Sequence, residues 1–195
     1  MKRKNKLPQN FDSKVLVINH IGSKGEGVSY LYTEFNNREK EYNFFIPFSL
    51  PNEIIIARPT HFSSEGIRAK IIEIKESSSD RIDPQCRHFF KCGGCLLQHW
   101  RFNNYKNWKF KKVLSPILKL SSNTHVKPII TSSLKSRRHA KFIAKKTKTT
   151  TIVGFNEYRT NFVTKINECI ILDKQLVKLI NNIENPLNNL LQIGE

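Results

Sequence analysis

Residues 86–95 have the sequence Cys86-Arg-His-Phe-Phe-Lys-Cys92-Gly-Gly-Cys95, and Cys169 is the fourth and last cysteine of the chain. Three thiols in ten residues suit a metal centre better than a disulfide framework. The adjacent glycines let the backbone curl and present open N–H groups to a sulfur-rich anion. A site that also takes Cys169 would join two distant segments. The sequence therefore predicts one metal site with the ligands Cys86, Cys92, Cys95 and Cys169.

The spacing of the cysteines favours an iron–sulfur cluster over zinc. Four thiolates suit either centre. Zinc sites usually contain two short pairs of ligands, whereas three close cysteines and a solitary fourth are typical of cluster ligation. We therefore predict a four-cysteine iron–sulfur cluster, with structural zinc, or no metal and simply buried free cysteines, as the alternatives. His88 and His99 flank the motif, and we expect them to be neighbouring donors or packed rings rather than ligands.

Length and composition indicate a globular protein of one large or two small domains. The chain has 195 residues, of which 38% are hydrophobic. No apolar run approaches the roughly 18–20 residues of a membrane span. The basic start precedes only a short apolar stretch at Val15, which predicts a strand and not a signal peptide. We therefore expect a cytoplasmic protein whose cysteines are reduced.

Positive charge is concentrated in the second half of the chain. Residues 1–85 carry 13 Lys and Arg against 11 Asp and Glu, whereas residues 86–195 carry 20 against 5. No acidic residue lies between Asp83 and Glu157. A biased base composition would raise Lys throughout but would not remove carboxylates from one window. The pattern predicts a nucleic-acid partner, with an anionic membrane surface as the weaker alternative.

Residues 11–76 predict a small all-β domain. Strands are expected at 11–18, 28–32, 42–46, 53–57 and 66–74, with turns between them. Five short strands suit an OB-like barrel that binds oligonucleotides. Gly22, Gly25 and Gly27 lack the dinucleotide-binding spacing and predict a connecting loop that needs positive φ. Phe44, Phe45 and Phe48 would either stack on bases or fill the core.

Residues 86–195 predict an α+β domain that binds the cluster and contacts nucleic acid. A helix is expected at 103–120, capped by Asn103 or Asn104 and interrupted at Pro116. Strands are expected at 126–131, 138–145, 149–155 and 161–166. From Lys174 a second helix, kinked or broken at Pro186, carries a leucine-rich stripe that is more typical of core than of a docking face. The fold class is thus mixed, with a linker at 76–80.

Several motifs together resemble the N-terminal half of the S-adenosylmethionine-dependent 5-methyluridine RNA methyltransferases. They are Cys86-x5-Cys92-Gly-Gly-Cys95-x2-Gln98-His99, Ser136-Arg-Arg-x-Ala-x-Phe142, Gly154-Phe155 and Cys169-Ile-Ile-Leu172. Residues 21–28 and 45–51 resemble the TRAM domain that precedes the cluster in the ribosomal RNA branch. Asn52, His139 and Ile170 depart from the family pattern, but none of these departures removes a cysteine.

The resemblance implies a 4Fe-4S cluster and a function in rRNA processing, but not catalysis by this chain alone. Family members use a cysteine nucleophile and a Rossmann-like domain for S-adenosylmethionine, and we expect both to be absent here, because the four cysteines are committed and Gly194 is the only glycine after Gly154. The hypotheses are a truncated or split enzyme that needs a separately encoded catalytic half, a stand-alone RNA-binding module with a structural metal centre, or a remnant without function.

The basic residues expected to contact RNA form two sets. Contacts to phosphates would set affinity rather than sequence preference. The first set lies around the Ser-Arg-Arg motif and the second lies on the first helix: Arg137, Arg138, Lys141, Lys145 and Lys146, and Lys109, Lys111 and Lys112.

Overall fold

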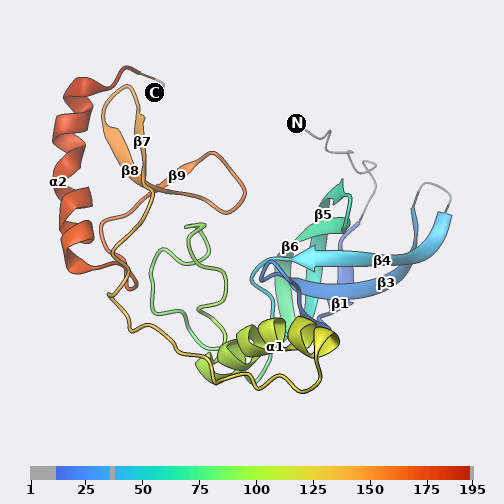
Figure 1. The fold of residues 1–195 in the computed structure, drawn as a ribbon. Coiled ribbons are helices and arrows are strands. Elements are labelled where there is room, and N and C mark those ends of the chain that lie inside the picture. The colour runs from blue at the N-terminus through green and yellow to red at the C-terminus, as the bar shows by residue number, and fades with distance from the viewer. Residues whose placement is uncertain (1–11, 36–37, 194–195) are drawn as a thin grey trace. The chain divides into compact units, whose positions relative to one another are not determined.

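The computed structural model describes residues 12–35 and 38–193 (Figure 1). The chain folds into two compact units. The first, the sheet unit, comprises residues up to Ile82 together with His99–Val126. The second, the cysteine unit, comprises Asp83–Gln98 and residues from Lys127 onward. This division groups 99–126 with the sheet, whereas the sequence boundary at residue 86 placed them with the cysteines.

A six-stranded sheet with the order β1-β5-β6-β4-β3-β2 forms the sheet unit. Its neighbours are antiparallel except for β4 and β6, which run parallel. The expected strands are confirmed, although most are longer than predicted. The start of the first expected strand, at Phe11, lies outside the described residues. The strands are β1 (Lys14–Val17), β2 (His20–Ile21), β3 (Gly27–Phe35), β4 (Arg38–Ile46), β5 (Ile54–Ser63) and β6 (Gly66–Glu76).

The two ends of this sheet are neighbours in the chain. Only Ile18 and Asn19 separate β1 from β2. Ile18 N donates to Glu53 O at 2.9 Å, and Asn19 N donates to Val28 O at 2.8 Å. The segment from β1 to β2 therefore bonds to β5 with its first half and to β3 with its second half.

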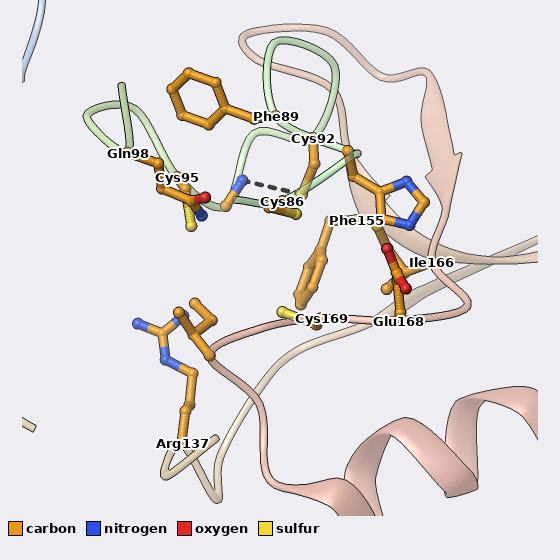
Figure 2. A pocket seen from close by; sticks show the side chains of 13 residues that line it. Cys86, Phe89, Cys92, Cys95, Gln98, Arg137, Phe155, Ile166, Glu168 and Cys169 are labelled. Carbon is orange, nitrogen blue, oxygen red and sulfur yellow. Dashed lines mark hydrogen bonds between the residues drawn. The ribbon is translucent and has the colours of Figure 1, made fainter. Parts of the chain in front are cut away.

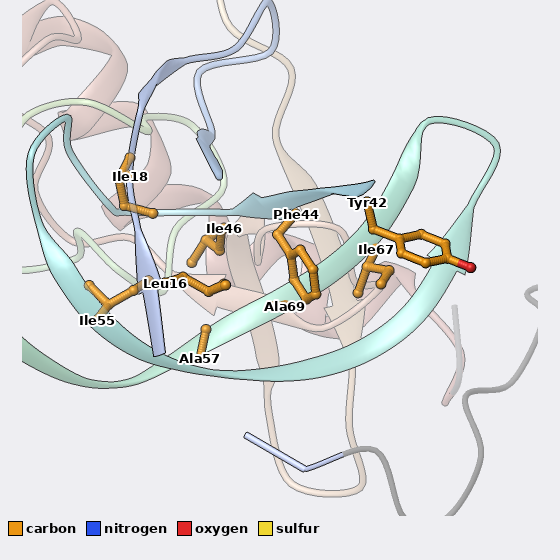
Figure 3. Packing of buried hydrophobic residues seen from close by; sticks show 9 residues of the cluster. All are labelled: Leu16, Ile18, Tyr42, Phe44, Ile46, Ile55, Ala57, Ile67 and Ala69. Atoms are coloured by element: carbon orange, nitrogen blue, oxygen red, sulfur yellow. The ribbon is translucent and has the colours of Figure 1, made fainter. Parts of the chain in front are cut away.

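Alternating side chains of these strands make the hydrophobic core of the sheet unit (Figure 3). Phe44 is fully buried at its centre, between Leu16, Ile55 and Ile67 of other strands. The idea that Phe44 stacks on bases is therefore wrong, because its cross-strand pairing turns it inward. Phe45 lies on the opposite face of β4, where its ring packs under the Arg68 guanidinium at 4.3 Å.

The glycine-rich segment before β3 is a connecting loop, as predicted. Gly25 has φ 84°, in the left-handed region that favours glycine. A Cβ on Gly27 would lie 2.0 Å from Ser49 Oγ, so the backbone there approaches its neighbour too closely for any side chain.

Helix α1 (Phe102–Leu120) confirms the first predicted helix and differs in its details. Its N-cap is Arg101, which makes no side-chain cap bond, so the predicted capping by Asn103 or Asn104 is wrong. Pro116 lies inside a continuous helix. Trp108 Nε1 donates to Ile21 O at 3.1 Å, which is one of the contacts that join the helix to the sheet unit.

A three-stranded antiparallel sheet with the order β7-β8-β9 and helix α2 (Lys174–Leu190) form the regular part of the cysteine unit. The strands are β7 (Ile143–Lys146), β8 (Thr151–Asn156) and β9 (Val163–Lys165), each within or near a predicted strand. The strand predicted at 126–131 is wrong, since these residues join no ladder.

Helix α2 packs its apolar stripe on this sheet. Ile180 is buried with Val153, Ile166 and Leu172, and Leu176, Ile183 and Leu187 pack against this cluster. The stripe is therefore core, as expected, while Leu179 and Leu190 remain exposed. Asp173 caps the helix by accepting from Gln175 N at 2.8 Å, and Pro186 does not break it. Neither described helix is long and apolar enough to span a membrane.

Candidate metal centre and nucleic-acid interface

The segment that carries the first three cysteines is a series of tight turns. Phe89 N donates to Cys86 O at 3.0 Å, and Cys92 N donates to His88 O at 2.8 Å. Gly93 N then donates to Asn156 O at 2.9 Å, where β8 ends. A Cβ on Gly93 would lie 2.8 Å from the same oxygen, so glycine is what lets this loop meet the strand.

Two pairs of side chains join the Cys86 loop to the Cys169 loop. Arg87 makes a two-point ion pair with Glu168, with 2.6 Å between Nη2 and Oε2. His88 Nε2 lies 3.1 Å from Asn167 Oδ1. These residues lie within two positions of Cys86 or Cys169 in the chain, so the two cysteine loops are held together by contacts close to the sulfurs.

All four cysteines line one pocket (Figure 2). None forms a disulfide, and each is partly buried. Gly94 N donates to Cys92 Sγ at 3.4 Å, which is the backbone-to-sulfur contact expected from the paired glycines. Within the described part of the chain, no group of three or more His, Cys, Asp or Glu side chains is placed so that it could hold a metal ion.

Burial and mutual repulsion make two of the thiols harder to ionise. Burial raises the pKa of Cys92 and of Cys95, and the negative charge of neighbouring cysteines raises both further. Gly94 N–H opposes this at Cys92, and a hydrogen bond with Gln98 opposes it at Cys95. A metal cation in the pocket would reverse the balance, because its charge favours the thiolate.

The two flanking histidines occupy different units. His88 lines the cysteine pocket. His99 is fully buried in the sheet unit, where its ring lies edge-on to Phe48 at 6.4 Å. Burial, and next the charge of Arg81, lower the pKa of His99 to about 4. His99 is thus a packed ring, as one of the expected alternatives had it.

The first set of predicted RNA contacts is divided among different environments. Arg138, Lys141 and Lys145 are exposed. Arg137 is also exposed, but it lines the cysteine pocket. Lys146 Nζ donates to Asn188 O and, at 2.7 Å, to Asn188 Oδ1, so its ammonium group is already bonded within the protein.

The second set lies on α1, which has no acidic residue. Lys109 and Lys112 lie over the Trp108 ring, with their ammonium nitrogens 5.3 and 4.8 Å from its centroid. Lys112 Nζ also donates to Ser23 O at 2.5 Å. Lys111 is exposed. Trp108 therefore contacts two lysines, and the i, i+4 spacing to Lys112 could have indicated one of these contacts.

Sequence analysis missed two buried ion pairs of the sheet unit. Glu53 is fully buried and accepts from Arg81 Nε at 2.5 Å and from Arg81 Nη2 at 2.8 Å. Glu26, 2% exposed, accepts from Arg68 Nη1 at 2.9 Å. Partners 28 and 42 residues apart leave no local pattern.

No family model matches this chain. It is 30% identical over 169 residues to an uncharacterized RNA methyltransferase of Brucella melitensis, and the aligned region covers 86% of this chain and 37% of that protein. It is 32% identical to an uncharacterized RNA methyltransferase of Caulobacter vibrioides, over 83% of this chain and 37% of the relative. It is 30% identical to the 23S rRNA (uracil(1939)-C(5))-methyltransferase RlmD of Acinetobacter baylyi, over 91% of this chain and 40% of the relative.

A solved structure shows a similar fold. It is the tRNA (uracil-54, C5)-methyltransferase of Pyrococcus abyssi in complex with S-adenosyl-L-homocysteine, with a TM-score of 0.54 and 24% identity. The match covers 86% of this chain and 35% of that one. The chain thus spans between a third and two fifths of the length of the relatives described here.

Proposed function

This chain is homologous to the N-terminal region of RNA methyltransferases, and on that premise we propose that it is the RNA-binding, cluster-bearing part of an RNA uracil-C5 methyltransferase. The observation that carries the proposal is the convergence of all four cysteines on one pocket. Cys169 comes from a segment more than 70 residues beyond Cys95, so the pocket is a product of the fold.

We propose a 4Fe-4S cluster held by Cys86, Cys92, Cys95 and Cys169. Four sulfur donors with a backbone N–H aimed at one of them suit this group. When bound, it would brace the 86–95 loop against the 169 loop and add to the folding free energy of the cysteine unit.

We propose that residues 11–76 form a TRAM-like OB barrel, followed by the cluster-binding region at 86–195. Two features support the barrel. The segment from β1 to β2 bonds to strands at both ends of the sheet, and a bent strand shared in this way would close it. The parallel pairing of β4 with β6 within an otherwise antiparallel sheet also suits a Greek-key barrel.

We propose RNA as the partner, with ribosomal RNA in the cytoplasm as its source. The exposed side chains of Arg138, Lys141, Lys145 and Lys111 provide the positive charge. The absence of carboxylates from 84 to 156 removes competition for these cations. Lys109, Lys112 and Lys146 already make contacts within the protein, so their part in RNA binding would be smaller.

Methyl transfer would need groups other than those described here. In the proposed site every cysteine is a ligand, so none is left as a nucleophile. S-adenosylmethionine would then act through a catalytic domain outside these residues. A stand-alone RNA-binding module is the second candidate function, and RNA binding by the isolated chain would support it.

Anaerobic purification of the chain tests both parts of the proposal. We expect a brown protein with visible absorbance and with iron and sulfide in the stoichiometry of a 4Fe-4S cluster. Binding to a ribosomal RNA fragment should weaken steeply with salt. Lys111→Ala should reduce the slope of the logarithm of the binding constant against the logarithm of the salt concentration by about 0.7. Zinc in place of iron would refute the cluster, and RNA binding that does not change with salt concentration would refute the RNA interface.

A further inference from the structure

The two adjacent arginines of the Ser-Arg-Arg motif have different places in the structure. We infer that Arg137 is a positioning residue of the sulfur site, where its guanidinium offsets the negative charge of four thiolates, whereas Arg138 faces RNA. The inference rests on the proposed cluster and assigns a separate task to a residue that charge alone groups with the RNA contacts.

Backbone hydrogen bonds fix Arg137 beside the Cys169 loop. Lys135 N donates to Ile170 O, Arg137 N donates to Ile171 O, and Asp173 N donates to Arg137 O, each at 2.9 Å. Arg137 pairs with Leu172 in an isolated parallel bridge. The residue is therefore held next to the segment that delivers the fourth sulfur, and its side chain lines the pocket together with Cys95 and Cys169 (Figure 2).

Arg137 is the cation of this pocket that no carboxylate neutralises. The other residue with a full charge on the lining is Glu168, which is occupied by Arg87. Among the described residues, Arg137 has no ion-pair partner. A guanidinium with no carboxylate partner, placed beside four sulfurs, would stabilise the negative charge of an anionic metal centre.

Arg138 is a matched control provided by the chain itself. It carries the same charge one residue further on and is exposed, but it does not line the pocket. Successive side chains of an extended segment point to opposite sides, which explains why only one of the two reaches the sulfurs. The pair therefore separates an effect on the cluster from an effect on RNA.

The experiment compares Arg137→Gln, Arg137→Lys and Arg138→Gln with the unchanged chain, all reconstituted anaerobically. We expect Arg137→Gln to lose its visible absorbance to a chelator about tenfold faster than the unchanged chain. Its reduction potential should move to a more negative value, because the reduced cluster loses a favourable charge. Arg137→Lys should keep most of the lifetime. Arg138→Gln should leave both properties unchanged.

For RNA binding we expect the reverse, with an effect of the Arg138 variant and none of the Arg137 variant. Arg138→Gln should lower the salt slope by about 0.7, as expected for one lost phosphate contact, and Arg137→Gln should leave it unchanged. An Arg137→Gln protein with a normal cluster lifetime and a reduced slope would overturn the inference. If Arg137→Gln does not fold, Arg137→Lys decides, and a folded Lys variant with rapid cluster loss would overturn it. An unchanged chain that binds no iron would instead refute the proposed function.

Discussion

The two units of this protein differ in what holds them together. Among the described residues, the sheet unit has nine buried hydrophobic side chains in one cluster, whereas the cysteine unit has four. The sheet unit adds two buried ion pairs. The cysteine unit instead gathers four sulfurs and links their loops by exposed pairs such as Arg87–Glu168, which contribute little in water. The comparison indicates that one unit is stabilised by its core, whereas the other has a smaller core and would depend more on the metal centre proposed above.

The largest expected effect comes from removing one sulfur ligand. Cys169→Ser should abolish the visible absorbance and unfold the cysteine unit, because metal binding contributes directly to its folding free energy. The sheet unit should stay folded. Trp100 and Trp108 are the only tryptophans and both lie in the sheet unit, so their fluorescence follows that unit alone. Increased hydrogen exchange confined to residues 83–98 and 127–193 would confirm the result, and exchange spread over both units would contradict the comparison.

The next effect is expected from the core of the sheet unit. Phe44→Ala should destabilise it by about 3–5 kcal/mol, because a fully buried ring is lost and a cavity is left. The change should appear in the tryptophan unfolding curve while the visible absorbance of the cysteine unit persists at low denaturant. Phe102→Ala, at a side chain that is 54% exposed, is the control and should change the stability by less than about 1 kcal/mol.

The pH dependence of the sheet unit should reveal the buried His99. Its pKa is lowered from 6.5 to about 4 in the folded state, so the folded state disfavours the protonated ring. This contribution to stability is fully present above pH 6.5 and is lost as pH falls through the interval down to about 4. The total loss is about 3 kcal/mol. The free energies of unfolding of the unchanged chain and of His99→Gln can be measured by tryptophan fluorescence from about pH 7 to 4. The difference between the two should shrink by that amount over this interval. Parallel curves would show that the ring titrates normally.

The smallest effect is expected in the loop before β3. Gly25→Ala should destabilise the sheet unit by about 1–2 kcal/mol, because φ 84° is strained for a residue with a Cβ. Gly25→Asn should lose less, since asparagine tolerates this region. Equal losses for the two variants, measured by tryptophan fluorescence, would mean that the side chain and not the backbone conformation sets the effect.

Periodicity predicted the strands of the sheet unit well, because apolar and polar residues alternate along them in the sequence. Both helices and the three strands of the second sheet were also found. The prediction failed where a partner distant in sequence decides the outcome. The 126–131 segment has the composition of a strand but finds no neighbour to pair with. The predicted 86–195 region also contains α1, whose Trp108 donates to Ile21 O of the sheet unit, and no local pattern indicates that contact.

By itself the sequence predicted which four cysteines would share a site, the positive charge of the second half and the strands of the first, because residue type and local spacing express these directly. Only the tertiary structure decided that Phe44 is core, that Arg137 and Arg138 have different surroundings, and that the loops of Cys86 and Cys169 meet. Each of these depends on which side a backbone turns toward a segment tens of residues away. Long-range pairing sets that direction, and no local pattern records it.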